Sequence, residues 1–413
     1  MQTETPTDIQ TEAQTIDQFK DIRPYHDHEV RPVVDALLAN PEFIRSIAGF
    51  SFPKLYRMLP GLVCWLTKSK LTAQVSTVNN VKTMQDIIAV YRDQMIEKTA
   101  SKLTHSGIEN LSHDKAYLFI SNHRDIAMDP AFVNYMLYHA GFNTVQIAIG
   151  DNLLKRPFVT DLMRLNKSFI VRRSLKGREL LKSSKLLSEY IHHCIDKGWN
   201  VWIAQREGRA KDGVDRTDTA LLKMLSMARR ETGLKDSLSA LHIVPVAISY
   251  EFDPCDTLKA DELYQKKELG SYQKDERSDI NSIVTGMIGF KGHVHVTFGK
   301  EIHLDSDDAD AAAAKIDEQI IQNYLLQPTN FFALELLRKT EPELIPALEL
   351  PAEIPADNDG SRAKFAERLA AADPKIRRWL LQMYANPVIS RYSVGKDDPF
   401  AAQLDSDEQQ VES

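Results

Sequence analysis

The chain has little cysteine: only three of its 413 residues are cysteines, namely Cys64, Cys194 and Cys255. They lie far apart, are odd in number and form no Cys-x-x-Cys motif. Disulfide frameworks and zinc sites need closely patterned cysteines, so neither is expected. We therefore predict reduced thiols, as in a cytosolic protein, and no metal site.

The sequence also lacks a secretory leader and a long hydrophobic run. Its first residues are polar, without the basic start and apolar core of a signal peptide. The longest uncharged stretch, 130–150, is interrupted by Asn134, His139, Asn143 and Gln146. A spanning helix needs about 20 predominantly apolar residues, so we expect no such helix and a cytoplasmic location.

Basic residues are not in surplus, because 51 Lys and Arg face 58 Asp and Glu, which gives a net charge of −7. General nucleic-acid binders usually carry a basic surplus, so no nucleic-acid partner is predicted. An apolar fraction of 43% allows a sizeable core. The length suffices for one large domain with helical additions, or for two domains.

What is present is a set of short apolar runs separated by helical patterns. The runs are AYLFIS, VQIAIG, SFIVRR, WNVWIA, HIVPVAISY and GHVHVTFG. This alternation predicts an α/β fold, with a mixed sheet flanked by helices and with helical N-terminal and C-terminal extensions. The predicted segments are a disordered tail (1–28), helices (29–105), the α/β domain (106–305), a helical extension (306–349), a linker (350–361), C-terminal helices (362–400) and an acidic tail (401–413).

The stretch 50–70 combines many large apolar side chains with the cations Lys54, Arg57, Lys68 and Lys70. A proline at position 60 predicts a kink or a break in the helix. Helices of this composition can lie in a membrane interface, with the apolar side in the lipid and the cations at the headgroups. An ordinary helix that packs its apolar face on the domain fits equally well, since periodicity does not separate the two.

The most informative stretch is SNHRDIAMDP, residues 121–130, in which His123 follows a buried strand and precedes a helix. Active sites of α/β folds gather at such strand ends. Asp125 and Asp129 are close in sequence, and a carboxylate beside an imidazole fixes its tautomer and raises its basicity. Asp129, which precedes Pro130, would also serve as a helix N-cap.

Three further stretches carry charges at strand ends. SFIVRRS ends in Arg172 and Arg173, of which one at most points into a given site unless the strand has ended. QREGRAKDG follows a strand and offers Glu207, Gly208 and Arg209, and IVPVAISYE is a strand with a proline inside it. Taken singly, each has a structural explanation as a solvated face, a charged turn or an edge strand.

Together and in this order, the four stretches resemble the sequence blocks of the glycerolipid acyltransferase family. The matching residues are Asn122, His123 and Asp129; Phe169, Ile170, Arg172 and Arg173; Glu207, Gly208 and Arg209; and Val244, Pro245 and Val246. The resemblance covers about 115–255. FIVRRSLKG and the EGR string look most similar to the glycerol-3-phosphate acyltransferase branch.

One departure concerns the spacing of the first block. The family keeps four residues between His and Asp, whereas this chain has five, RDIAM. Either the turn holds an extra residue and Asp129 still partners His123, or Asp125 has taken that role. We favour Asp129, because an Asp-Pro helix start matches the family's position for it, with Asp125 in reserve.

The resemblance implies acyl transfer from a thioester, of acyl-CoA or acyl-carrier protein, to a hydroxyl of glycerol-3-phosphate or lysophosphatidate. His123 would be the general base, and Arg172, Arg173 and Arg209 would bind the phosphate, with Glu207 and Gly208 in the same acceptor site. Neither a metal nor a cofactor is implied. The lipid substrate or product implies a peripheral location on the inner face of the cell membrane.

Three other functions fit parts of the pattern. An ester hydrolase would need a serine nucleophile, and the sequence has no G-x-S-x-G elbow. A metal site could combine His123 and Asp125 with His192 or His193. A non-catalytic relative that binds lipid at a membrane surface is consistent with the altered His-Asp spacing.

Overall fold

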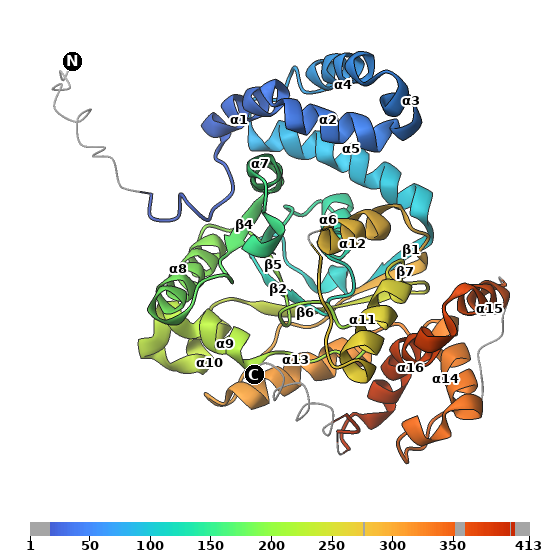
Figure 1. Cartoon of the computed structure of the whole chain (residues 1–413). Coiled ribbons are helices and arrows are strands. Elements are labelled where there is room, and N and C mark those ends of the chain that lie inside the picture. Colours follow the sequence, from blue (N-terminus) through green and yellow to red (C-terminus); the bar gives the residue numbers. More distant parts are fainter. Residues whose placement is uncertain (1–16, 276, 352–359, 397, 401–413) are drawn as a thin grey trace.

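The computed structural model describes residues 17–275, 277–351, 360–396 and 398–400, which fold around one seven-stranded sheet (Figure 1). The strands are β1 (Ala100–Ser106), β2 (Leu118–Ser121), β3 (Gln146–Gly150), β4 (Ser168–Val171), β5 (Val201–Ala204), β6 (Ile243–Tyr250) and β7 (Gly292–Phe298). The predicted acidic tail and most of the predicted linker lie outside the described residues.

The helices fall into three groups along the chain. The N-terminal group is α1 (Asp27–Ala39), α2 (Pro41–Ser51), α3 (Pro53–Met58), α4 (Pro60–Gln74) and α5 (Val81–Thr99). Within the sheet region lie α6 (Met128–His139), α7 (Pro157–Leu165), α8 (Gly177–Asp196), α9 (Thr219–Leu225), α10 (Gly233–Ser239), α11 (Asp256–Glu268) and α12 (Ser278–Ile288). The C-terminal group is α13 (Ala309–Asn323), α14 (Pro328–Thr340), α15 (Ser361–Ala371) and α16 (Arg377–Ser393).

The sheet has the order β1-β7-β6-β2-β5-β3-β4 and is mixed. Strands β6, β2, β5, β3 and β4 are parallel to one another, and β7 runs antiparallel to β6. In register, Ser121 at the end of β2 lies opposite Ala204 at the end of β5. The segments that follow β2, β3, β4 and β5 therefore emerge along one edge. The mixed α/β fold predicted from the sequence is confirmed.

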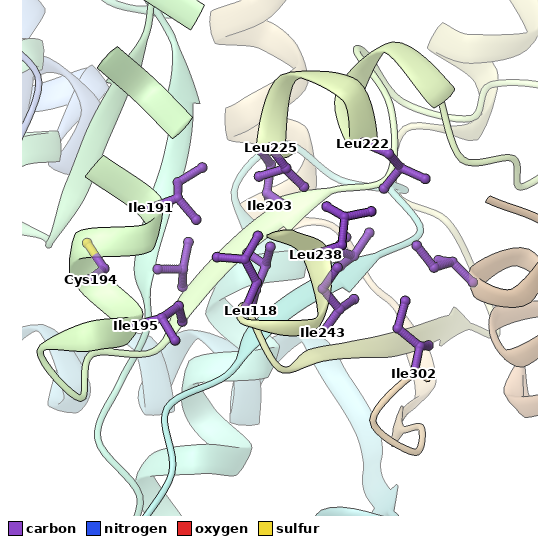
Figure 2. Close-up of a cluster of buried hydrophobic side chains, with 14 of the residues drawn as sticks. Leu118, Ile191, Cys194, Ile195, Ile203, Leu222, Leu225, Leu238, Ile243 and Ile302 are labelled. Carbon is purple, nitrogen blue, oxygen red and sulfur yellow. The ribbon is translucent and has the colours of Figure 1, made fainter. Parts of the chain in front are cut away.

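Alternating side chains of the strands build a core on each face of the sheet. Leu118, Ile203 and Ile243 face α8, α9 and α10, as Figure 2 shows. Phe119, Trp202 and Val244 face the other way, in a core with Phe132 of α6. Two smaller cores lie at the ends of the chain, one among the N-terminal helices and one among α14, α15 and α16. No described helix combines the length and apolarity needed to cross a membrane.

Two predictions about the N-terminal part were wrong. Residues 17–28 are ordered, because Phe19 and Ile22 are buried and the Ile170 backbone N–H donates to the Ile22 carbonyl at 2.9 Å. The helical segment predicted over 29–105 ends at Thr99, and strand β1 follows. This strand, ASKLTHS, escaped prediction because it is a mostly polar edge strand whose position depends on its pairing with β7.

The helical pattern over 50–70 is interrupted as expected from its proline. Helices α3 and α4 are separated by Leu59, and Pro60 is the first residue of α4. A proline at the first helical position is favourable because its missing N–H would have no intrahelical partner there. The break allows α2, α3 and α4 to fold back on one another, as Figure 1 shows.

A pair of histidines links β1 to β7. The Thr104 hydroxyl lies 2.6 Å from His293 Nε2 and 2.6 Å from His295 Nδ1, and the Ser106 hydroxyl lies 3.1 Å from His295 Nε2. Burial, reinforced by the neighbouring His293, His105 and Lys102, lowers the pKa of His295 to about 4. The folded protein therefore keeps this ring neutral at pH values where the unfolded chain protonates it.

We expect this pKa difference to make the fold sensitive to mild acid. A histidine in the unfolded chain titrates near 6.5, so the contribution of His295 to the free energy of unfolding is complete above that pH. It is lost progressively as the pH falls towards 4, by up to roughly 3 kcal/mol. Denaturant unfolding between pH 7 and 4.5 should show a shallower pH slope for His295→Gln than for the wild type. The exposed His303→Gln serves as control, and equal slopes in all three proteins would contradict the expectation.

Candidate active site

A cleft of about 910 Å³ lies along the edge of the sheet at which β2, β4 and β5 end. Its walls also include residues of α5, α6, α8 and α12. The residues predicted from the sequence that line it are His123, Arg172, Arg173, Glu207, Gly208 and Arg209. The two remaining predicted residues, Asp125 and Asp129, are buried behind this surface.

Asp129 orients the imidazole of His123 through a hydrogen bond to Nδ1. The distance from His123 Nδ1 to Asp129 Oδ2 is 2.8 Å, and the Asp129 carboxylate is fully buried whereas the imidazole is 14% exposed. The Trp202 ring stands edge-on to the imidazole, with 5.9 Å between centroids. Because Nδ1 is bound to the carboxylate, Nε2 is the nitrogen that remains for proton transfer in the cleft.

Asp129 accepts three further hydrogen bonds. Oδ2 accepts from the backbone N–H groups of Arg124 at 2.7 Å and Asp125 at 2.9 Å, and Oδ1 accepts from the Tyr250 hydroxyl at 2.6 Å. Burial and the nearby carboxylates of Asp129 and Asp125 raise the pKa of Tyr250 well above its usual value, so this phenol stays a donor. Four donors around one carboxylate fix its orientation towards the histidine.

The two carboxylates of this turn have different partners. Asp129, the partner favoured from the sequence, lies at His123, whereas Asp125 Oδ1 accepts from the N–H groups of Ala127 and Met128 at 2.9 and 2.8 Å, at the start of α6. The N-cap expected at Asp129 was wrong, because α6 begins at Met128 and Asp129 lies in its first turn. The extra residue in the turn is thus accommodated while Asp129 reaches His123.

The second oxygen of Asp125 is buried and makes no hydrogen bond within the described residues. It faces Gly286 of α12, where a Cβ atom would lie only 1.9 Å from Oδ2. Burial first, and then the charge of Asp129, raises the pKa of Asp125. The close approach of α12 to this carboxyl group therefore depends on glycine at position 286.

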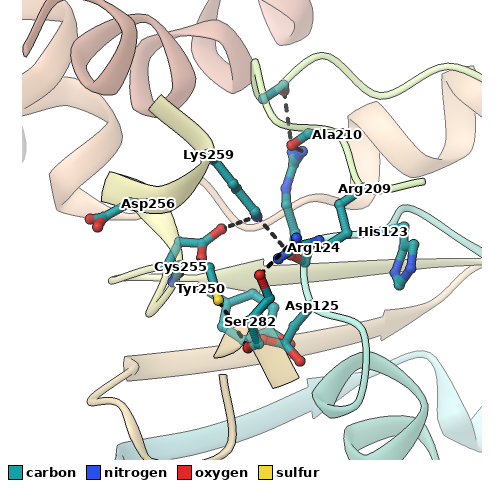
Figure 3. A network of polar contacts seen from close by, with 12 residues as sticks. His123, Arg124, Asp125, Arg209, Ala210, Tyr250, Cys255, Asp256, Lys259 and Ser282 are labelled. Atoms are coloured by element: carbon teal, nitrogen blue, oxygen red, sulfur yellow. Dashed lines mark hydrogen bonds and ion pairs between the residues drawn. The ribbon is translucent and has the colours of Figure 1, made fainter. Parts of the chain in front are cut away.

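Buried hydrogen bonds and ion pairs connect the turn that carries His123 to neighbouring segments (Figure 3). The Arg124 guanidinium donates to Asp215 at 2.6 Å and to the Gly213 carbonyl at 3.2 Å. Burial disfavours its charge, but Asp215 outweighs this and raises the pKa of Arg124. The Arg124 carbonyl in turn accepts from Lys259 at 2.6 Å, and Lys259 forms an ion pair with Asp253.

The loop after β5 is also held by the C-terminal helix α16. A Cβ atom at Gly213, which has φ of +80°, would lie 2.1 Å from the Met383 carbonyl. The Asn386 side chain donates to the Asp212 carbonyl at 2.8 Å, and Arg216 pairs with Asp398 at 2.7 Å. The C-terminal part of the chain therefore forms the outer support of the loop that carries Arg209.

Both arginines after β4 line the cleft because the strand ends at Val171, before either of them. Asp151 fixes this turn: it accepts from the Arg173 N–H at 3.1 Å and from the Ser174 hydroxyl at 2.6 Å. Arg173 Nη1 lies 3.4 Å from Glu207 Oε1, which joins the turns after β4 and β5. Arg172 points towards Asp21, at 3.9 Å, and is 42% exposed.

Arg209 is the most enclosed of the predicted cationic groups. Its Nη2 donates to the Ser282 hydroxyl of α12 at 3.2 Å. Its Nη1 is buried and has no hydrogen-bond partner among the described residues. An unsatisfied buried donor of a charged group is costly, and an anionic ligand in the cleft would satisfy it.

Several site residues were missed by sequence reasoning. Tyr250 was visible at the end of the fourth block, but nothing in the sequence linked it to Asp129. Ser282 and Gly286 lie outside every block and reach the site only because α12 folds over it. No described group of three or more His, Cys, Asp and Glu side chains is arranged to hold a metal. His192, one of the metal ligands considered, instead lies 3.1 Å from the Leu225 carbonyl.

Comparison with known proteins agrees with this geometry. A family model described as Acyltransferase matches residues 102–249, which run from within β1 to within β6 and contain His123, Asp129 and Arg209. These residues are thus similar to an acyltransferase domain. The comparisons support the resemblance of this region to the glycerolipid acyltransferase family.

Curated relatives include the glycerol-3-phosphate acyltransferase of Pseudomonas paraeruginosa, which is 26% identical over 236 residues. The protein of that name from Pseudomonas fluorescens is 27% identical over 234 residues. These alignments cover 56% and 55% of this chain but only 27% of each relative. The solved 1-acyl-sn-glycerophosphate (LPA) acyltransferase PlsC from Thermotoga maritima is 13% identical, with a TM-score of 0.36 over 68% of this chain and 92% of that chain.

Proposed function

We propose that this protein transfers a fatty acyl group from a thioester to a hydroxyl of a glycerol phosphate, with His123 as the general base. The acceptor is glycerol-3-phosphate or its 1-acyl ester, and the donor is acyl-CoA or acyl-carrier protein. The observation that carries the proposal is the His123–Asp129 pair facing an arginine-lined cleft. The matching acyltransferase family supports the reaction class.

The proposed reaction needs no serine nucleophile. His123 Nε2 removes the proton of the acceptor hydroxyl as its oxygen attacks the thioester carbonyl. The new C–O bond forms, the C–S bond breaks, and the imidazolium returns the proton to the leaving thiolate. Asp129 keeps the other ring nitrogen protonated and stabilises the transient positive charge. Among the described residues, the only side chain hydrogen-bonded to His123 is Asp129, which leaves Nε2 for the acceptor.

Replacing the proposed base should remove activity without unfolding the protein. We expect His123→Ala to lower kcat about 10²- to 10⁴-fold, the usual contribution of a general base. The assay should offer both acceptors and both donors to the purified full-length enzyme, with the lipid product identified by mass. His303→Ala, an exposed histidine outside the cleft, is the control. An unchanged rate for His123→Ala would remove the mechanism, and transfer to neither acceptor would remove the substrate assignment.

Arg209 should contribute mainly to binding of the acceptor phosphate. A charge-assisted hydrogen bond is worth about 1.5–3 kcal/mol, so Arg209→Met should raise the acceptor KM about 10- to 100-fold. Ser282→Ala removes the hydroxyl that accepts a hydrogen bond from Arg209 Nη2. This variant should raise the acceptor KM several-fold, with a smaller effect on kcat. Ser282→Thr retains the hydroxyl and should recover most of the loss.

Ser184 supplies the matched control, because it lines another wall of the same cleft. Ser184→Ala should leave the acceptor KM unchanged. Equal effects of Ser184→Ala and Ser282→Ala would assign the loss to general loosening of the cleft. A fall in kcat alone after Arg209→Met would contradict a role in acceptor binding.

Peripheral attachment to the inner face of the cell membrane is part of the proposed function. Helices α2, α3 and α4 expose a group of large apolar side chains, between 42% and 75% exposed: Phe50, Phe52, Leu55, Met58, Leu59, Leu62, Trp65 and Leu66. Such a patch on a monomeric surface marks an interaction site. Cations in the same helices suit a lipid headgroup region.

Charging this apolar surface should detach the protein from lipid. We expect Leu62→Asp with Leu66→Asp to lower co-sedimentation with liposomes at least about 10-fold, since each buried leucine contributes roughly 1.5–3 kcal/mol. Leu181→Asp with Leu269→Asp changes two leucines that are at least as exposed elsewhere and should bind like the wild type. Full retention of the first variant would reject this membrane face.

A further inference from the structure

Charge is segregated along the N-terminal helices. From Phe43 to Gln85 the sequence contains no aspartate or glutamate, although acids outnumber bases in the whole chain. The same stretch contains Arg45, Lys54, Arg57, Lys68, Lys70 and Lys82. A surface with cations and without acids favours an anionic partner.

Most of these cations form no ion pair with any described residue. Of the six, only Lys82 has a carboxylate partner among the described residues, at 3.3 Å from Asp86 of the same helix. Arg45 and Lys68 are exposed. Their charges are therefore available to a ligand.

Arg45 and Lys68 stand at a second, separate groove. It has a volume of about 380 Å³ and lies among α1, α2, α3 and α4. Its apolar lining includes Leu38, Ile44, Tyr56, Gly61, Cys64 and Trp65. None of its residues lines the catalytic cleft. Sites for small molecules are commonly of this kind, roughly 300–1,000 Å³ and apolar with few polar groups that set orientation.

The position of the groove points to its occupant. Trp65 is 65% exposed and belongs both to the groove lining and to the apolar surface of α2, α3 and α4. An acyl chain that enters the groove from a bilayer would leave its headgroup at the rim, where the two cations lie. A soluble anion would pair with the two cations but would leave the apolar lining of the groove without a ligand.

We propose that this groove binds one acyl chain of an anionic bilayer phospholipid, with the phosphate held by Arg45 and Lys68. The site is distinct from the cleft of His123 and does not require acyl transfer to occur. It makes retention on the membrane depend on lipid charge and on a discrete chain-binding groove. The alternative is that the apolar surface of α2, α3 and α4 simply partitions into the bilayer. In that case its exposed side chains alone would be sufficient for membrane binding.

Gly61 offers a test that separates these two modes. A Cβ atom at this position meets nothing within 4 Å, and its backbone φ is not positive. Gly61→Leu should therefore fold normally, and because Gly61 lines the groove it should add a bulky side chain to the groove wall. If a chain binds there, this variant should lose affinity about 10-fold or more; if the surface only partitions, added apolar area should preserve or strengthen binding.

The probe is dihexanoyl-phosphatidylglycerol in monomeric form, titrated into the full-length protein while Trp65 fluorescence is followed. Trp65→Phe supplies the blank. The wild type should saturate, and dihexanoyl-phosphatidylcholine should bind at least about 10-fold more weakly, because each basic residue near an anionic lipid contributes about 1 kcal/mol. Arg45→Glu with Lys68→Glu should abolish the preference.

Lys223→Glu with Arg230→Glu is the matched control, because both side chains are exposed on α9 and the following turn, far from α4 (Figure 1). Saturation that is unaffected by Gly61→Leu, or equal affinity for both lipids, would overturn the proposal. A Trp65 response to protein concentration without lipid would identify a second copy as the occupant and overturn it equally. Activity is not the readout, so failure here is distinguishable from failure of the acyltransferase assignment.

Discussion

The Asp129 carboxylate is the group on which the site depends. It is fully buried, yet it accepts hydrogen bonds from the imidazole, from two backbone N–H groups and from the Tyr250 hydroxyl. A buried charge without such partners would be strongly unfavourable, so the turn after β2, the start of α6 and the end of β6 must meet at one point. The geometry of the His123–Asp129 pair and the packing of the central strands are therefore stabilised by the same four contacts.

The sequence predicted the central part of the fold well because local and tertiary preferences agree there. Runs such as LFIS and VWIA are apolar on both faces, as expected of strands covered by helices on both sides. Strand β1 could not be found in this way, since its polar residues belong to a sheet only through pairing with β7. Residues 17–28 were misjudged for a related reason: two apolar side chains, Phe19 and Ile22, suffice to order a polar segment.

The residues at the cleft were predicted by type and order, and Asp129 was favoured as the partner of His123. The pattern did not show that Asp125 binds the N–H groups at the start of α6, because this depends on where the helix begins. Ser282 and Gly286 carry no local signal at all. They matter because α12, inserted between β6 and β7, approaches Asp125 and Arg209 from the opposite side of the cleft. Contacts between segments so far apart in the sequence cannot be predicted from the spacing of residues along the chain.

The support of Gly213 and Asp212 by α16 has a consequence for the order in which the protein matures. The loop between β5 and α9 is synthesised long before the helix that contacts it, and its backbone at Gly213 is shaped to receive the Met383 carbonyl. During synthesis the sheet can form first, while the segment bearing Arg209 still lacks its outer wall. The wall of the cleft at Arg209 can therefore gain its outer support only when α16 docks, after most of the chain has been synthesised.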